Sequence, residues 1–303
     1  MSTVTLQSKR ALFPGSLMLT RTFVQFALAV GLGTNLSLAA PLAAQSARGS
    51  LLVVGGGTQP DALVEEFVRL AGGPGKARIV VMAMASESGE RSGESKAADL
   101  RKRGATARNL WFSREQADRD SLVRLLDSAT GIWFGGGDQN KLAAVIRGTK
   151  MERAIRSRWE NGAVVGGTSA GAAVLSTPMI TGDELGTRRD TSEAWTRIER
   201  GSVKVDSGFS FITNAVIDQH FVRRKRTNRL LSLVLATPPH LGAGIDEGTA
   251  LIVEPSGRWR IMGVSVVIVY DARRAERTTT GVLGARDIRM HVLTNGMTFD
   301  PTK

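Results

Sequence analysis

Apolar and polar positions alternate along the chain in a way that predicts strands and helices in turn. Short apolar runs indicate buried strands at 51–54, 78–85, 107–112, 131–134 and 163–166. Segments with helical spacing lie between them, at 61–70, 95–103, 114–126, 141–146 and 151–159. This alternation is typical of βαβ units, so we expect an α/β fold with a mainly parallel central sheet and helices on both faces. Ligands bind beyond the carboxyl ends of the strands in such sheets, and the glycine-rich turns lie there, at 55–57, 135–137 and 166–171.

The second half of the chain predicts more strands and fewer helices. The polar, irregular stretch 182–210 favours an active-site loop, and a strand at 215–217 and a helix at 223–235 follow it. Four further strands are expected at 243–245, 249–254, 258–262 and 264–270, with a C-terminal β extension over 275–303. The sequence shows no internal repeat and no low-complexity linker, so we expect one domain over 48–303.

Residues 1–47 have the features of a secretory signal peptide. Three basic residues precede an apolar stretch from 23 to 38, small residues follow it, and the first acidic residue is Asp61. Cleavage is expected near 44–47, and a start at Met18 would give a shorter signal. The alternative is a membrane anchor, but glycines and polar residues interrupt the apolar stretch. We therefore expect the mature protein in the periplasm or outside the cell.

Charge and composition exclude several classes of function. The formal net charge of the 303 residues is +12, but the basic residues are dispersed and there is only one Tyr, so nucleic-acid binding is not expected. The chain has no Cys, which excludes disulfides, thiolate metal sites and cysteine catalysis, including that of glutamine amidotransferases. The three histidines, His220, His240 and His291, have no zinc-ligand spacing, so neither a metal nor a cofactor is expected.

A Gly-x-Ser-x-Gly motif places Ser169 at the end of a predicted strand. It runs from Gly167 to Gly171, between an apolar run and a helix-compatible stretch. This strand–turn–helix context is that of a nucleophile elbow, whose crowded backbone requires small neighbouring residues. Because 34 residues are glycine, a simple glycine-rich turn is the alternative.

The other parts of a serine hydrolase can be found elsewhere in the sequence. His220, in Asp218-Gln219-His220-Phe221, is the candidate general base. The backbone N–H of Ala170 is the first candidate donor to an oxyanion. The second donor would come from the glycine turn that contains Gly136 and Gly137, where the backbone can approach a ligand closely. That turn lacks the spacing of a dinucleotide site.

Four motifs occur in an order that resembles the cyanophycinases and the related aspartyl dipeptidases. They are Phe134-Gly135-Gly136-Gly137-Asp138-Gln139, Gly167-Thr168-Ser169-Ala170-Gly171-Ala172, Asp218-Gln219-His220-Phe221 and Gly244-Ile245-Asp246-Glu247. The resemblance extends from about residue 51 to about residue 270. It implies a flavodoxin-like sheet similar to the class I glutamine amidotransferase domain. It also implies hydrolysis of cyanophycin, a polyaspartate with arginine on each β-carboxyl group, to β-aspartyl-arginine by a Ser–His–acid triad.

The resemblance also implies roles for individual residues. Ser169 would be the nucleophile and His220 the base. The residues that would line the substrate pocket are Gln139, Asp218, Gln219, Arg224, Arg226 and Arg229. The arginines would pair with substrate carboxylates, and the alternative is a solvated basic helix face, because they do not share one side of an ideal helix.

The acid of the triad is expected shortly after the elbow helix, and we choose Glu184. Asp183 is adjacent to it, Asp190 and Glu193 lie further on, and Asp218 is a rival because it is close to His220. Asp246 and Glu247 are expected on a turn near the site, without an assigned role. His240 and His291 are expected to be structural.

Two other functions remain open from the sequence. One is an aspartyl dipeptidase that cleaves Asp-X or isoAsp-X peptides, and the other is a noncatalytic binding protein of the same fold. Intact Ser169 and His220 argue against the second. The sequence also leaves open whether the chain forms a homodimer.

Overall fold

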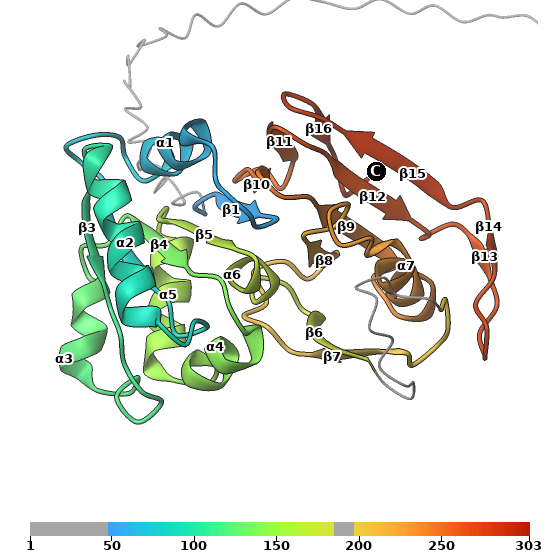
Figure 1. Cartoon of the computed structure of the whole chain (residues 1–303), viewed down its shortest axis with the longest axis horizontal. Helices are drawn as coiled ribbons and strands as arrows, with labels where there is room; N and C mark the ends of the chain where they lie inside the picture. Colours follow the sequence, from blue (N-terminus) through green and yellow to red (C-terminus); the bar gives the residue numbers. More distant parts are fainter. Residues whose placement is uncertain (1–47, 185–196) are drawn as a thin grey trace, which may run out of the picture. The chain divides into compact units, whose positions relative to one another are not determined.

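A computed structural model describes residues 48–184 and 197–303. The larger sheet formed by these residues has eight strands in the order β16-β11-β10-β1-β5-β4-β2-β3 (Figure 1). In that order they are β16 (Thr298–Phe299), β11 (Trp259–Gly263), β10 (Thr249–Val253), β1 (Leu51–Val54), β5 (Val164–Thr168), β4 (Gly131–Phe134), β2 (Arg78–Met82) and β3 (Thr106–Asn109).

The parallel part of this sheet has a flavodoxin-like strand order. Strands β3, β2, β4, β5 and β1 all pair in parallel, and the first four have the 2-1-3-4 pattern of the flavodoxin-like fold. The fifth position is filled by β1, the first strand of the chain. Strands β10, β11 and β16 then extend the sheet in antiparallel fashion beyond β1.

The described residues also form a second sheet, which has six strands. Its order is β15 (Arg289–Leu293), β12 (Val267–Asp271), β9 (Leu241–Ile245), β8 (Val216–Gln219), β6 (Met179–Glu184) and β7 (Val203–Asp206). Strands β8 and β9 are parallel, with Gln219 opposite Ile245. A short ribbon of β13 (Glu276–Arg277) and β14 (Ala285–Arg286) precedes β15.

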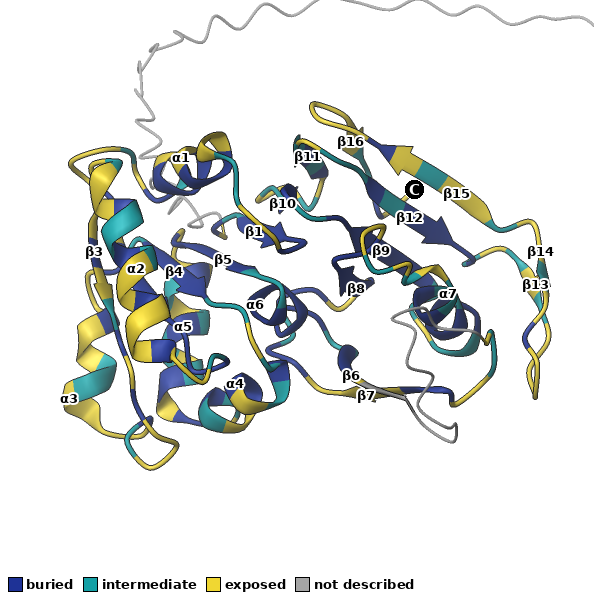
Figure 2. Ribbon diagram, viewed as in Figure 1, coloured by how far each residue is buried: buried dark blue, intermediate teal, exposed yellow. Residues whose placement is uncertain are grey.

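Helices cover both faces of the larger sheet, as expected. One face packs on α1 (Asp61–Leu70) and α2 (Gly89–Lys102), and the other packs on α4 (Gln139–Ile146), α5 (Lys150–Glu160) and α6 (Ala170–Ala173). α7 (Thr227–Ala236) packs on the second sheet. Because β1 is covered on both faces, all four of its residues are apolar and buried (Figure 2). The expected α/β class is confirmed, with the strands divided between two main sheets.

Some predicted elements differ from those observed. The segment 114–126 forms turns, a short α3 (Asp120–Val123) and a 3-10 helix (Arg124–Leu126) rather than one helix. The stretch 182–210, expected to be a loop, contains the end of β6 and all of β7. The predicted helix 223–235 begins later, at Thr227, and the basic run before it forms a turn.

The three chain segments that follow β5, β8 and β9 meet at the end of β1. Val54 pairs with Thr168 at the ends of β1 and β5, and α6 begins directly after Ser169. The short α6 contacts β5 and β8, and therefore lies between the two sheets (Figure 1). Over 48–184 and 197–303, no helix is both long and apolar enough to span a membrane.

Candidate active site

Ser169 occupies a strained turn between β5 and α6. Its backbone has φ 54° and ψ −113°, a conformation that is uncommon for a residue with a side chain. The turn is closed by small residues: a Cβ at Gly167 would overlap the backbone of Gly171, and one at Gly171 would overlap the carbonyl group of Phe134. The predicted elbow is thus observed, and its glycines are required by close backbone contacts.

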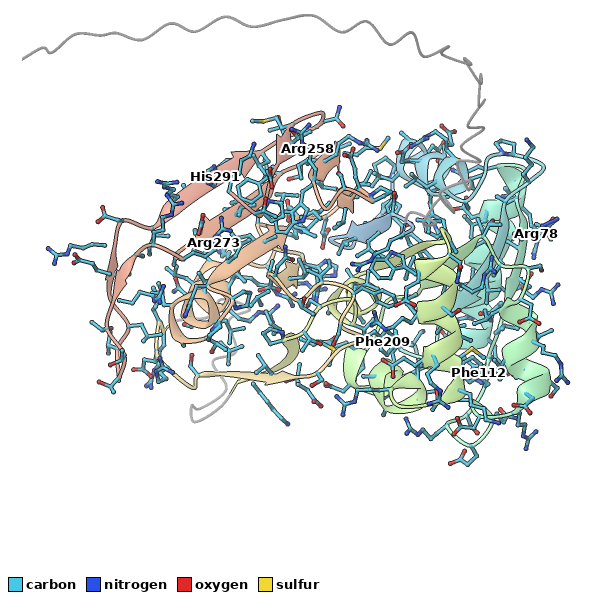
Figure 3. All side chains as sticks on the ribbon, turned by 180° about the vertical axis from the view of Figure 1, so that it is seen from behind. Arg78, Phe112, Phe209, Arg258, Arg273 and His291 are labelled. Carbon is cyan, nitrogen blue, oxygen red and sulfur yellow. The ribbon has the colours of Figure 1, made fainter. Side chains whose placement is uncertain are left out.

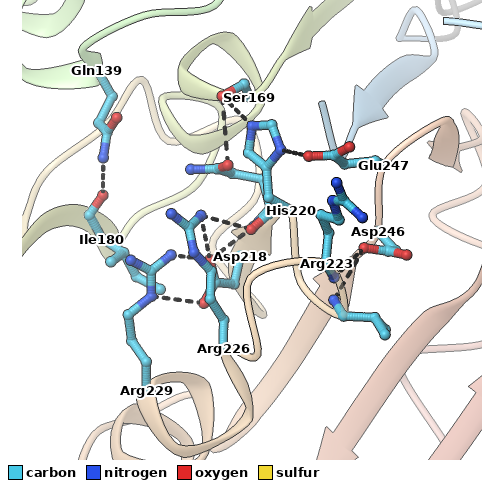
Figure 4. A network of polar contacts seen from close by, with 12 residues as sticks. Gln139, Ser169, Ile180, Asp218, His220, Arg223, Arg226, Arg229, Asp246 and Glu247 are labelled. Carbon is cyan, nitrogen blue, oxygen red and sulfur yellow. Dashed lines mark hydrogen bonds and ion pairs between the residues drawn. The ribbon is translucent and has the colours of Figure 1, made fainter. Parts of the chain in front are cut away.

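His220 directly follows β8, and its ring faces the serine. Its Nε2 lies 2.9 Å from Oγ of Ser169 (Figure 4). The residue is 7% exposed and has a left-handed backbone with φ 49°. A buried imidazole at this distance can accept the hydroxyl proton of a serine.

The other ring nitrogen of His220, Nδ1, contacts the carboxylate of Glu247, which lies two residues after the end of β9. Its Oε1 lies 2.5 Å from Nδ1 of His220. This is a correction to the choice of Glu184, because a neutral imidazole with Nε2 as acceptor has one N–H at Nδ1, and Glu247 accepts its hydrogen bond. Glu184 ends β6, and its side chain lies outside the described residues. The sequence signal for Glu247 is the Gly244–Glu247 motif, although the sequence alone assigns this residue no role.

Backbone N–H groups suited to an oxyanion lie next to Ser169. A Cβ at Gly136 would be 3.5 Å from Cβ of Ser169, so the β4 exit turn contacts the elbow. Within the described part of the chain, the amides of Gly136, Gly137 and Ala170 donate no hydrogen bond. Unpaired N–H groups at such a position can stabilise negative charge on a carbonyl oxygen.

Asp218 and Arg229, predicted to contact substrate, are bound to each other instead. The carboxylate of Asp218 is 1% exposed and accepts two hydrogen bonds from the guanidinium of Arg229, one of them from Nε at 2.9 Å. Arg226 lies 3.7 Å from the same carboxylate and donates to the carbonyl group of Gln219 at 2.7 Å. These three charges therefore hold the backbone next to His220.

The remaining predicted pocket residues take different positions. Gln139, at the start of α4, is buried and donates to the carbonyl group of Ile180 at 2.8 Å. Oε1 of Gln219 lies 3.5 Å from Oγ of Ser169, so this amide is adjacent to the nucleophile. Arg224 is half-buried, and its guanidinium has no hydrogen bond or ion pair with the described residues.

Asp246 explains why the basic run does not continue as a helix. Its Oδ1 accepts hydrogen bonds from the amides of Val222 and Arg223, at 3.1 and 2.9 Å. Its Oδ2 accepts from the hydroxyl of Ser265 at 2.7 Å. A carboxylate that caps two successive amides fixes the turn directly after His220.

The surroundings of His220 favour its neutral form. Burial lowers the pKa of the imidazole from its ordinary value of 6.5, and the charges of Arg224 and Arg226 lower it further. The hydrogen bond to Glu247 and the charge of that carboxylate raise the pKa, but the balance is downward. A base with a lowered pKa stays unprotonated, and hence competent, at mildly acidic pH.

The other two histidines lie elsewhere. Nδ1 of His240 lies 2.8 Å from the carbonyl oxygen of Val234. His291 is on β15 (Figure 3). Its ring packs edge-on against Phe299. Among the described residues no group of three or more His, Cys, Asp or Glu could hold a metal ion.

The model of peptidase family S51 matches residues 51–258. A cyanophycinase of Synechococcus elongatus is 34% identical over 62% of this chain, and the match spans 58% of that protein, which is less than two thirds of its length. A cyanophycinase of Geminocystis herdmanii is 30% identical over 83% of this chain and 93% of its own length. The crystal structure of a peptidase from an acI-B1 Actinobacterium shares the fold, with a TM-score of 0.61 and 24% identity over 84% of this chain and 98% of its own.

Proposed function

Since the chain belongs to peptidase family S51, we propose that it is a serine peptidase with Ser169 as nucleophile, His220 as general base and Glu247 as the acid. One observation carries this proposal: Nε2 of His220 lies 2.9 Å from Oγ of Ser169, and Nδ1 of the same ring lies 2.5 Å from Oε1 of Glu247. In this arrangement Glu247 holds the Nδ1–H tautomer and stabilises the imidazolium that forms during the reaction.

The reaction follows from the positions of these groups. As Oγ of Ser169 attacks the scissile carbonyl carbon, its proton passes to Nε2 of His220. The negative charge on the carbonyl oxygen would be stabilised by the amides of Ala170 and the Gly136–Gly137 turn. The imidazolium then gives its proton to the leaving amine, and a water molecule activated by the same histidine releases the acyl group.

We propose cyanophycin as the substrate and β-aspartyl-arginine as the product. Support comes from the relatives named cyanophycinase and from the half-buried Arg224 next to His220. The backbone N–H of Arg224 donates to the carbonyl group of His220 at 2.9 Å, so the residue lies on the turn directly after the base. A guanidinium without a protein partner can form a bidentate pair with the free α-carboxylate of an arginine attached to the polymer.

The test is incubation of the purified protein with cyanophycin and, separately, with Asp-X and isoAsp-X dipeptides, with products identified by mass. We expect soluble β-aspartyl-arginine from the polymer. Cleavage of the dipeptides alone would indicate the aspartyl dipeptidase activity instead, and no product from any of them would contradict the peptidase proposal.

Replacing Glu247 with Gln should lower kcat by roughly 10³- to 10⁴-fold, because an amide can favour the wrong imidazole tautomer and cannot stabilise the imidazolium. Glu184→Gln is the matched control and should keep kcat within about twofold. Steady-state kinetics on both variants checks this. A large loss in Glu184→Gln with near-normal Glu247→Gln would return the acid role to Glu184.

The acidic limb of the pH profile should lie below pH 6.5, because burial and then the arginines lower the pKa of His220. Arg224→Gln removes one of those positive charges, so the pKa of His220 should rise and the limb should move to higher pH. Arg223→Gln, on the same turn, is the control, since its charge is not among the causes of the shift. The measurement is kcat/KM as a function of pH for the wild type and both variants. An acidic limb at the same pH in all three proteins would contradict its assignment to His220.

We also propose that residues 1–47 are a cleaved secretory signal, which lies outside the described residues. The sequence pattern alone supports this proposal. N-terminal sequencing of the protein from its native host should give a start near residues 45–48. A start at Met1 or Met18 in a cytoplasmic fraction would contradict it.

A further inference from the structure

Three consecutive carbonyl groups at the end of β1 each bind a different segment of the triad. The carbonyl oxygen of Val54 accepts from the amide of Ser169 at 3.0 Å, and that of Gly55 accepts from the amide of His220 at 2.6 Å. The next one, of Gly56, accepts from the amide of Gly248 at 3.0 Å, and Gly248 directly follows the acid of the triad. The spacing of adjacent peptide units along one strand end thus sets the spacing of three segments that are remote in sequence.

Two of the residues held in this way have strained backbones. Ser169 and His220 both have positive φ, at 54° and 49°. For residues with a side chain this conformation is unfavourable and persists only where the surroundings impose it. The carbonyl groups of Val54 and Gly55 accept from the amides of these two residues, so the β1 end is part of what imposes the conformation.

The glycines after β1 also leave space for the side chains of the triad. Gly56 has φ 113°, and a Cβ there would overlap the imidazole of His220 at Cε1 and would lie 2.5 Å from Nε2. At Gly57, with φ 68°, a Cβ would lie 2.8 Å from Oε2 of Glu247. The loop can therefore lie flat against both side chains only because it has none of its own.

We propose that Val54–Gly57 is a frame that positions the triad, and that Gly56 is the positioning residue for the imidazole of His220. The inference rests on the proposed function and adds to it a segment that acts through His220 and Glu247. Displacement of the ring would affect proton transfer more than substrate binding, so kcat should change and KM should not.

Gly56→Ala tests the proposal, with Gly72→Ala as the matched control. Gly72 has almost the same φ, 110°, but a Cβ there would be 3.7 Å from its nearest neighbour, an ordinary contact. The backbone strain is therefore similar in both variants, and only Gly56→Ala displaces the imidazole. We expect kcat to fall roughly 10²-fold in Gly56→Ala with KM within twofold, since a displacement of about 1 Å can cost that much. Gly72→Ala should have normal kinetics.

Two further measurements test this proposal independently of the proposed substrate. The rate of inactivation by phenylmethylsulfonyl fluoride needs no substrate, and it should fall with kcat in Gly56→Ala alone. In the wild type, a nuclear Overhauser effect should join Hα of Gly56 to Hε1 of His220, one of only three histidines in the chain. Its absence would overturn the proposal even if the variant did not fold. Equal kinetics in the two alanine variants would do the same, whereas a wild type inert to the reagent but showing this effect would overturn only the serine mechanism.

Discussion

Replacing Ser169 with alanine should reduce kcat/KM by about four orders of magnitude while leaving the fold intact. The change removes the proposed attacking atom, and loss of a triad nucleophile typically costs at least this much, with a small residual rate from the oxyanion donors. The side chain makes few contacts, since its hydroxyl lies 2.9 Å from His220 and 3.5 Å from Gln219. Steady-state kinetics on cyanophycin and thermal unfolding of the same preparations measure the two effects.

The control for this change is Ser256→Ala, on the exposed turn between β10 and β11. It should have the activity of the wild type. Phenylmethylsulfonyl fluoride should form an adduct that maps to Ser169 by peptide mass analysis and is absent from Ser169→Ala. Turnover of Ser169→Ala within a few-fold of the wild type would show that another group performs the chemistry.

The features predictable from the sequence were those set by neighbouring residues. The helix and strand periods of the first half gave the α/β class, because a strand covered on both faces, such as Leu51–Val54, must be apolar throughout. The elbow at Ser169 was predictable for a similar reason, since a turn between a strand and a helix with crowded backbone requires Gly167 and Gly171 next to it.

The features that were not predictable depend on pairing between remote segments. Nothing in the local pattern places β1 beside β5 or divides the later strands into a second sheet. The sequence alone assigns Glu247 no role because its position follows from the parallel register of β8 and β9, in which Gln219 is opposite Ile245. Residues just beyond two such strand ends lie close together, so His220 and Glu247 can meet although 27 positions separate them.

The basic run after His220 shows a conflict between local and tertiary signals. Its composition and spacing are compatible with a helix over 223–235, but the chain forms a turn until Thr227. The carboxylate of Asp246, from the other strand end, binds the amides of Val222 and Arg223 and fixes that turn. As a result the arginines of the run differ in environment: Arg229 is paired with Asp218, whereas the guanidinium of half-buried Arg224, like that of exposed Arg223, has no partner among the described residues.

The largest expected effect on stability comes from Asp218→Ala. Its carboxylate is 1% exposed and forms a two-pronged ion pair with Arg229, which is itself 5% exposed. Removing one partner leaves a buried guanidinium without its counter-charge, which typically costs about 3–5 kcal/mol in the free energy of unfolding. Urea unfolding followed by circular dichroism measures this loss.

Two comparisons show whether the loss of stability in Asp218→Ala comes from an unpaired buried charge or from breaking an ion pair as such. Glu276→Ala breaks the exposed pair with Arg286, whose side chains are 69% and 82% exposed, and should change the free energy of unfolding by less than about 1 kcal/mol.

The double variant Asp218→Leu with Arg229→Met removes both buried charges and should recover much of the stability lost in Asp218→Ala, because no unpaired charge then remains inside. Activity should not recover with it, since the backbone between Asp218 and His220 would lose the Gln219 amide's hydrogen bond to Asp218 as well as the pairing with Arg226. If Asp218→Ala were as mild as Glu276→Ala, the pair would not be a buried structural element, and the original prediction of a substrate-binding role for both residues would regain its place.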